Sequence, residues 1–113
     1  MSPKNALRTF GFLFLAGCGA NEVVGCDFRA DGPLGPEAYC EDRTGSANLF
    51  EDVCLRTNGQ IVEGGCSTTG AVAGCDRGAD DEFTSVIGWY YEPTTRVEVE
   101  TECAEDGGTV IDP

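Results

Sequence analysis

The chain has 113 residues and a net charge of −13, with 20 acidic residues against 7 basic ones. This length allows one small domain, and the negative charge argues against nucleic-acid binding, which depends on lysine and arginine contacts to phosphate. Because the chain contains no histidine, the hydroxyls of Ser67, Thr68 and Thr69 have no partner for Ser-His-Asp catalysis. We therefore expect a protein that is not an enzyme.

The N-terminal residues have the pattern of an export signal. Lys4 and Arg8 precede an uncharged apolar run over residues 10–16. A helix that spans a membrane needs about 20 apolar residues, whereas a basic head, a short apolar run and small residues are typical of a secretory signal. We predict that residues 1–17 are removed. The mature charge is then −15 (−13 − 2), because Lys4 and Arg8 leave with the signal.

The end of this segment, Leu15-Ala16-Gly17-Cys18, resembles the lipobox of bacterial lipoproteins at all four positions. In that family the cysteine receives a diacylglycerol and becomes the N-terminus. The resemblance implies that Cys18 carries lipid, that the membrane is a partner through this lipid, and that residues 18–25 form the lipidated cysteine and a short tether. In the family an Asp after the cysteine marks retention in the inner membrane, so Gly19 favours the outer membrane.

Six further cysteines lie in the predicted mature domain, residues 26–113. Their spacing contains no C-x-x-C pair, and no histidine is available as a metal ligand, so a disulfide framework is favoured over a metal site. The fifteen pairings that six cysteines allow stay open at this point. The predicted disulfide cysteines are Cys26, Cys40, Cys54, Cys66, Cys75 and Cys103.

The first half of the domain reads as a hairpin followed by a helix. Residues 26–30 and 38–43 flank a loop over residues 31–37 that contains two Gly-Pro pairs, and this pattern indicates an irregular hairpin. The next segment has an N-x-x-E capping box at Asn48, with Ser46 as another candidate cap. Apolar residues then fall on one helical face, and Asn58-Gly59 ends the helix. The apolar residues are Leu49, Phe50, Val53 and Cys54.

The C-terminal residues repeat part of this pattern. Residues 54–63 align without gaps on residues 103–112, with a cysteine, a glycine, two β-branched residues and a closing acid in common. We interpret each copy as a helix end, a glycine reversal and a short strand, with a chance match as the alternative. Residues 95–104 are compatible with a strand or a helix. The helix is favoured because Thr95-x-x-Glu98 resembles a capping box.

Two strands are predicted between these copies, over residues 71–75 and 84–91, with an acidic loop over residues 76–82 between them. The second strand is the most aromatic and β-branched segment, so we expect it to be central, and Pro93 prevents its continuation. The predicted fold is therefore of α+β class: a small, disulfide-rich antiparallel sheet with one or two short helices.

Two groups of residues in this region are candidate sites. Trp89, Tyr90 and Tyr91 alternate between the two faces of a strand, so one face is expected in the core and the other, if it is exposed, is a candidate partner-binding patch. The acidic loop is a weak calcium candidate that lacks the EF-hand spacing, and a solvated loop is favoured. We expect no metal site and no cofactor. The acidic residues considered are Asp76, Asp80, Asp81 and Glu82.

The mature part also loosely resembles uncharacterised cysteine-rich lipoproteins of myxobacteria-like bacteria, through its Cys-x4-Gly-[Gln/Thr] repeats and its Gly-Trp-Tyr-Tyr strand. This resemblance implies the class of protein, a cysteine-rich lipoprotein, but it implies no molecular mechanism. The favoured interpretation is a membrane-anchored envelope module without enzymatic activity, which has a structural role or binds a protein with a basic patch. The alternatives are a calcium-dependent binding module that uses the acidic loop, and an exported protease inhibitor that uses the loop of residues 31–37.

Overall fold

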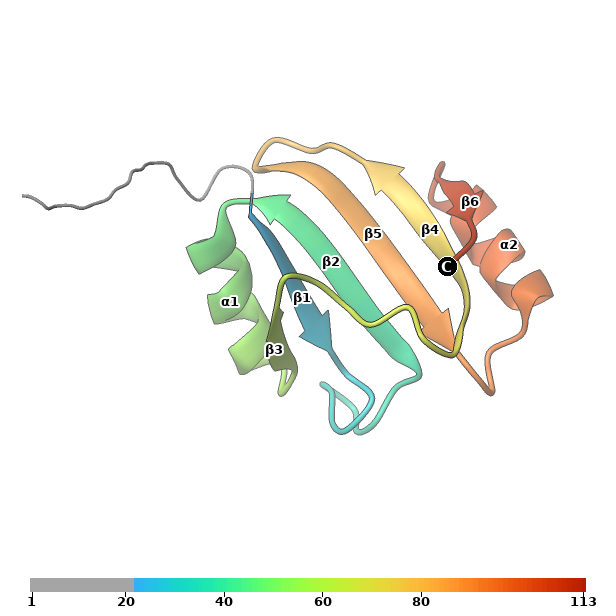
Figure 1. Cartoon of the computed structure of the whole chain (residues 1–113), viewed down its shortest axis with the longest axis horizontal. Coiled ribbons are helices and arrows are strands. Elements are labelled where there is room, and N and C mark those ends of the chain that lie inside the picture. Colours follow the sequence, from blue (N-terminus) through green and yellow to red (C-terminus); the bar gives the residue numbers. More distant parts are fainter. Residues whose placement is uncertain (1–21) are drawn as a thin grey trace, which may run out of the picture.

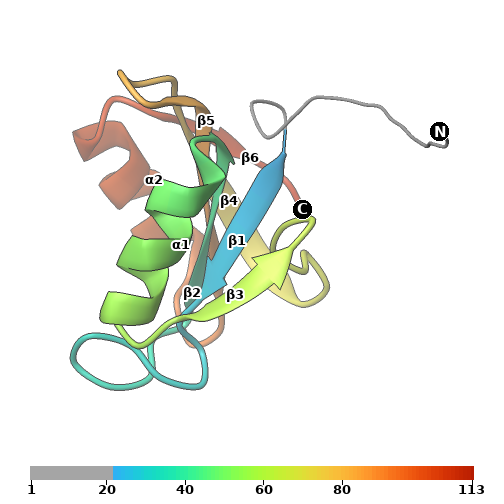
Figure 2. The same ribbon diagram turned by 90° about the vertical axis from the view of Figure 1, so that its left-hand side faces the viewer.

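The computed structural model describes residues 22–113, so the predicted signal and Cys18 lie outside the described residues. Two helices lie on one face of a six-stranded antiparallel sheet, whose strand order is β3-β1-β2-β5-β4-β6 (Figure 1, Figure 2). This arrangement confirms the α+β class. The elements in chain order are β1 Val23–Asp27, β2 Tyr39–Gly45, α1 Ala47–Arg56, β3 Gln60–Glu63, β4 Ala71–Gly78, β5 Phe83–Tyr91, α2 Arg96–Glu105 and β6 Thr109–Ile111.

The predicted hairpin is confirmed, but it begins earlier than expected. Strand β1 pairs with β2 from Val23 onward, and the side chain of Val24 is only 4% exposed because it packs beneath α1. The placement of residues 23–25 in a tether is therefore wrong. Residues 23–25 form a strand because the side chains of Val24 and Cys26 lie on the same face of β1, toward the helices, and both belong to the core.

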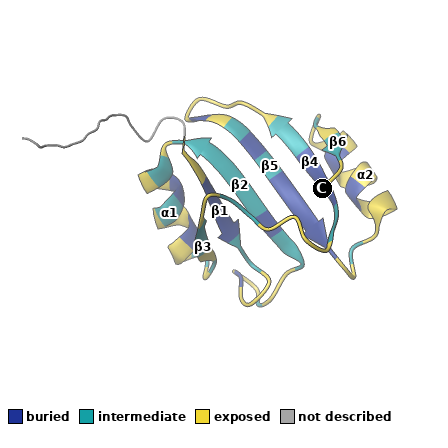
Figure 3. Ribbon diagram, viewed as in Figure 1, coloured by how far each residue is buried: buried dark blue, intermediate teal, exposed yellow. Residues whose placement is uncertain are grey.

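Strand β5 is central, as predicted, and it is longer at its start than the sequence indicated. It pairs with β2 on one side and β4 on the other, and its last three residues are buried (Figure 3). Strand β4 extends to Gly78 and β5 begins at Phe83, so the connection is shorter than the predicted acidic loop of residues 76–82.

The two helices begin differently. Helix α1 follows Ser46, whose hydroxyl donates to the carbonyl of Glu82 rather than capping the helix, and the Asn48 capping box is not formed. Helix α2 follows Thr95, which forms the predicted capping box with Glu98. Residues 95–104, whose sequence is compatible with a strand or a helix, are therefore helical from Arg96 onward.

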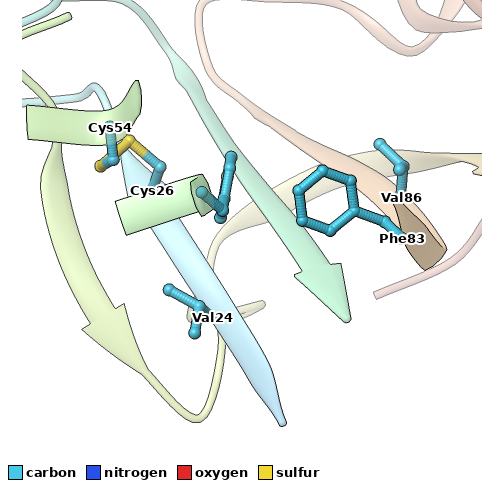
Figure 4. Packing of buried hydrophobic residues seen from close by; sticks show 6 residues of the cluster. Val24, Cys26, Cys54, Phe83 and Val86 are labelled. Carbon is cyan, nitrogen blue, oxygen red and sulfur yellow. A yellow bond between two sulfur atoms is a disulfide. The ribbon is translucent and has the colours of Figure 1, made fainter. Parts of the chain in front are cut away.

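All six cysteines form disulfides, as predicted. Cys26–Cys54 joins β1 to α1 within one core cluster (Figure 4), and Cys75–Cys103 joins β4 to α2 in a second cluster. Cys40–Cys66 lies on the other face of the sheet, where it fixes the β3–β4 connection to β2 (Figure 1). Each closes a loop of similar length, with sequence separations of 28, 26 and 28.

The similarity between residues 54–63 and 103–112 corresponds to equal local structures. Each copy is a helix end, a glycine and an edge strand. The glycines are needed because they touch the disulfides: a Cβ at Gly59 would overlap both sulfurs of Cys26–Cys54, and one at Gly108 would lie 2.6 Å from the Cys75 sulfur. Only glycine leaves room for the disulfide between helix and strand.

Candidate protein-binding surface

The aromatic residues of β5 do not form an exposed patch. Trp89 and Tyr91 lie on one face and Tyr90 on the other, as their alternation predicted, but all three are at most 7% exposed. Tyr90 packs in one cluster with Val99 and Cys103 of α2, and Trp89 and Tyr91 pack on the other face with Cys66 of the β3–β4 connection. The exposed face that a partner-binding patch at these residues requires is therefore absent. The C-terminal part of β5, which contains the three aromatic residues, is therefore buried on both faces of the sheet, whereas Thr84 near its start is exposed.

The acidic residues of the predicted calcium loop are divided between two elements. Asp76 lies in β4 and accepts a hydrogen bond from its own chain at Gly78. Asp80 accepts from the backbone N–H groups of Glu82 and Phe83 at 2.9 and 2.8 Å, and these bonds lower the pKa of its carboxyl. Within residues 22–113, no group of three or more His, Cys, Asp or Glu side chains is placed to hold a metal ion.

The connection between β1 and β2 contains the most exposed large apolar side chain of the described residues, Leu34, which is 97% exposed. The connection closes in a tight turn, since the N–H of Gly35 donates to the carbonyl of Gly32 at 3.2 Å. Asn58, at the end of α1, donates to the same carbonyl at 3.3 Å. Leu34 therefore projects from a turn that is attached to the helix behind it.

The two sides of the base of this connection are joined by backbone hydrogen bonds. The N–H of Phe28 donates to Tyr39, and the N–H of Glu37 donates to Phe28, at 3.0 and 2.9 Å. Just below, one disulfide ties β1 to α1 through Cys26–Cys54, and another ties β2 to the β3–β4 connection through Cys40–Cys66. We name residues 31–37 the Leu34 loop. Backbone bonds and disulfides at its base restrict its conformations, which lowers the entropy that a binding partner must remove.

Arg29 lies beside the base of the Leu34 loop. Its guanidinium pairs with Asp27 through two bonds of 3.0 and 2.8 Å and lies 4.0 Å from the ring centroid of Tyr91. The hydrogen bonds from Arg29 lower the pKa of the Asp27 carboxyl against the opposing effect of burial. This pair fixes the start of the loop to the central strand.

A cavity of about 350 Å³ lies between α2 and the sheet, where a polar network connects the two halves of the chain. Arg77 donates to the hydroxyls of Tyr39 and Tyr90 at 3.1 and 2.7 Å and to Asp106 at 3.0 Å. Burial disfavours the charged guanidinium, but these partners outweigh it and raise the pKa of Arg77. The pKa of Tyr39 is raised by burial and by Glu41. The guanidinium of Arg77 therefore stays charged and the hydroxyl of Tyr39 stays neutral, and their hydrogen bonds stabilise the fold.

The two ends of the sheet differ in character. Glu22 and the turns before α1 and β5 share one end, where they line a cavity of about 540 Å³. Further acids at this end are Glu51, Glu63, Asp80 and Asp81. The Leu34 loop lies at the opposite end of β1 (Figure 1). Each of the five arginines of residues 22–113 pairs with a carboxylate, so the excess acids determine the sign of the surface charge.

Comparisons with known proteins gave no match among protein-family models, curated proteins or solved structures. Within the described part of the chain, none of the helices is long and apolar enough to cross a membrane. The three disulfides indicate folding in an oxidising, extracytoplasmic environment.

Leu34 is the surface residue that sequence reasoning missed. The Gly-Pro pairs around it indicate only a turn, and the segment is otherwise a candidate only for the loop of an inhibitor. The available signal was a single large apolar residue inside a segment of turn residues. Such a residue has no periodic apolar neighbours, so neither strand nor helix alternation can bury it.

Proposed function

We propose that this protein is an exported, lipid-anchored envelope module without enzymatic activity, which binds another protein through the Leu34 loop. The lipobox-like Leu15-Ala16-Gly17-Cys18 supports the anchor. The three disulfides support export. The observation that carries the proposed binding role is the 97% exposure of Leu34 on a loop whose two flanking strands are each tied to another part of the domain by a disulfide.

The distance between the proposed anchor and the Leu34 loop supports this role. The chain from Cys18 to Val23 reaches at most about 17 Å, so the end of the sheet that contains Val23 lies near the lipid. Strand β5 has nine residues, and at about 3.3 Å per residue it separates the two ends of the sheet by roughly 26 Å. The Leu34 loop then points away from the membrane, toward a partner.

The acids at the end near the anchor contribute to the same orientation. Glu22, Glu63 and the turn with Asp80 and Asp81 face this end. Anionic lipid headgroups repel them over a screening length of about 8 Å at physiological ionic strength. The lipid is then the attachment, and the domain stands away from the headgroups.

The chemistry of the Leu34 loop defines the partner. Asp31 and Glu37 lie at the two ends of the loop, on either side of Leu34, and the closed turn does not offer the extended backbone that adds as a strand to another sheet. A single apolar side chain between two acids fits an apolar pocket with a basic rim. Association should then slow as the salt concentration rises.

The anchor is tested by Cys18→Ser in the full precursor. We expect an unprocessed chain that no longer partitions into the detergent phase, because the thiol that receives the lipid is lost. Cys103→Ser serves as a control, since it removes a cysteine in a disulfide far along the chain. A Cys18→Ser chain that is processed and membrane-bound like the wild type would exclude lipid attachment at this residue.

The binding surface is tested by a photo-crosslinking residue at position 34 in intact cells. We expect one discrete cross-linked product that Asp31→Lys with Glu37→Lys weakens, because these changes repel a basic rim. The matched control is position 97, since Val97 is also exposed, at 69%, but lies on α2. Equal cross-linking at both positions would contradict a role for the Leu34 loop.

The second candidate function is protease inhibition, which the rigid and exposed Leu34 loop also favours. Titration of serine proteases that prefer leucine separates the two functions. Stoichiometric inhibition that Leu34→Asp removes would support the inhibitor, and cleavage of the loop without inhibition would oppose it.

A further inference from the structure

We propose that the domain consists of two copies of one ββαβ unit, and that these two units bind each other as separate bodies through a noncovalent interface at the seam between β2 and β5. The first unit contains β1, β2, α1 and β3, and the second contains β4, β5, α2 and β6. The strand order β3-β1-β2-β5-β4-β6 reads the same from both edges when equivalent strands are exchanged.

The sequences of the two units agree at the positions that form their cores. Residues 23–31 and 72–80 are identical at six of nine positions, including the Gly-Cys-Asp of β1 and β4. Cys75 and Cys103 follow Cys26 and Cys54 by the same 49 positions (75 − 26 and 103 − 54). This offset also relates the buried residues of the helices, Phe50 and Val99.

The register of the sheet defines the symmetry of the seam. Glu41 lies opposite Cys26, and Gly88 lies opposite Cys75, so Glu41 and Gly88 are equivalent. These two residues also pair with each other across the seam. A pseudo-two-fold axis therefore passes through the Glu41–Gly88 pair, and each unit presents the same edge to the other, as in an isologous dimer.

The seam has the contacts of a protein interface. Besides the β2–β5 ladder, the rings of Tyr39 and Tyr90 lie 4.9 Å apart. The indole of Trp89 donates to Asp42 at 3.1 Å. Aromatic side chains with hydrogen-bonding ends are typical of interface centres.

No disulfide of the described residues crosses this seam. Cys26–Cys54 and Cys75–Cys103 each lie within one unit, and Cys40–Cys66 ties the connection after β3 to the first unit. Beyond Cys66, only the chain of residues 67–70 joins the units covalently. The seam must then hold the two units together by noncovalent contacts.

The proposal is tested by cutting the connection in the otherwise intact protein. A recognition sequence for a specific protease is inserted between Thr69 and Gly70, and a matched control carries it between Gly64 and Gly65. Both cut proteins should elute as one species under native conditions. In denaturant without reductant, the first should separate into two fragments, whereas the control stays joined through Cys40–Cys66.

Removing the denaturant should return the two fragments to a one-to-one complex. Gly88→Glu should weaken this complex at least tenfold, since it sets a second carboxylate opposite Glu41 and its Cβ would lie 2.5 Å from the Tyr39 hydroxyl. Ala104→Glu adds the same charge on the exposed side of α2 and should change nothing. Fragments that separate under native conditions, fail to recombine, or stay covalently joined would each overturn the proposal.

Discussion

The glycines after the two helices offer a direct test of how the disulfides shape the fold. A Cβ at Gly108 would lie 2.6 Å from the Cys75 sulfur, 2.9 Å from the Asp76 carbonyl and 3.0 Å from the Cys103 sulfur. None of these atoms can move without shifting the β4–β6 ladder or the disulfide. Crowding of this kind costs about 1–3 kcal/mol. We expect Gly108→Ala to lower the free energy of unfolding by this amount, and Gly59→Ala to have a similar effect.

The neighbouring position provides the matched control. Gly107 has φ of 73° and open space around its Cα, and the equivalent residue of the first unit is Asn58, with φ of 67°. Because asparagine tolerates this left-handed conformation, Gly107→Asn should stay within about 0.5 kcal/mol of the wild type.

Urea unfolding and thermal melts of a secreted form that starts at Gly19 measure these differences. For a domain of this size, 1 kcal/mol corresponds to a shift of about 4–8 °C in Tm. If Gly108→Ala melted within 1 °C of the wild type while Gly107→Asn lost stability, the disulfide would not be the reason for the glycine.

Two further predictions concern a disulfide and a carboxylate. Replacing Cys40 and Cys66 together by serine opens a loop of 26 residues and should cost about 3.5 kcal/mol by chain entropy, while urea unfolding with both other disulfides intact still shows a folded protein. The pKa of Asp27 is lowered by hydrogen bonds from Arg29, so its contribution is present above the ordinary value of 3.8 and is lost as the pH falls below it. Asp27→Asn should therefore be less stable than the wild type at pH 6, and this difference should shrink between pH 4 and pH 2 in melts; a difference independent of pH would contradict the role of the carboxylate.

Local patterns predicted much of this fold. The hairpin, the central strand, the capping box at Thr95 and the set of disulfide cysteines followed from turn residues, alternation and spacing. Each of these depends on residues close together in the chain, or on an even count of cysteines. The pairing of the cysteines did not follow, because it depends on which strand each helix covers.

The burial of the aromatic residues of β5 could not be predicted from the sequence, for a related reason. The burial of Tyr90 depends on α2, and that of Trp89 on the β3–β4 connection, and both are long-range contacts. The repeat of residues 23–31 in residues 72–80 was visible in the sequence. It becomes informative when it is combined with the similarity of residues 54–63 and 103–112, which has the same offset of 49 positions (103 − 54 and 72 − 23). A repeat of this length indicates two equal structural units.

The pair on the pseudo-two-fold axis shows what a single chain can do that two identical subunits cannot. Two identical subunits would place glutamate against glutamate there, or glycine against glycine. In this chain Glu41 accepts hydrogen bonds from Tyr39 and Arg43, while Gly88 leaves the space that Tyr39 and Arg77 occupy. Once both halves are encoded in one gene, each side of the axis can mutate independently. The centre of the molecule then becomes its most asymmetric place, and the halves can acquire different tasks.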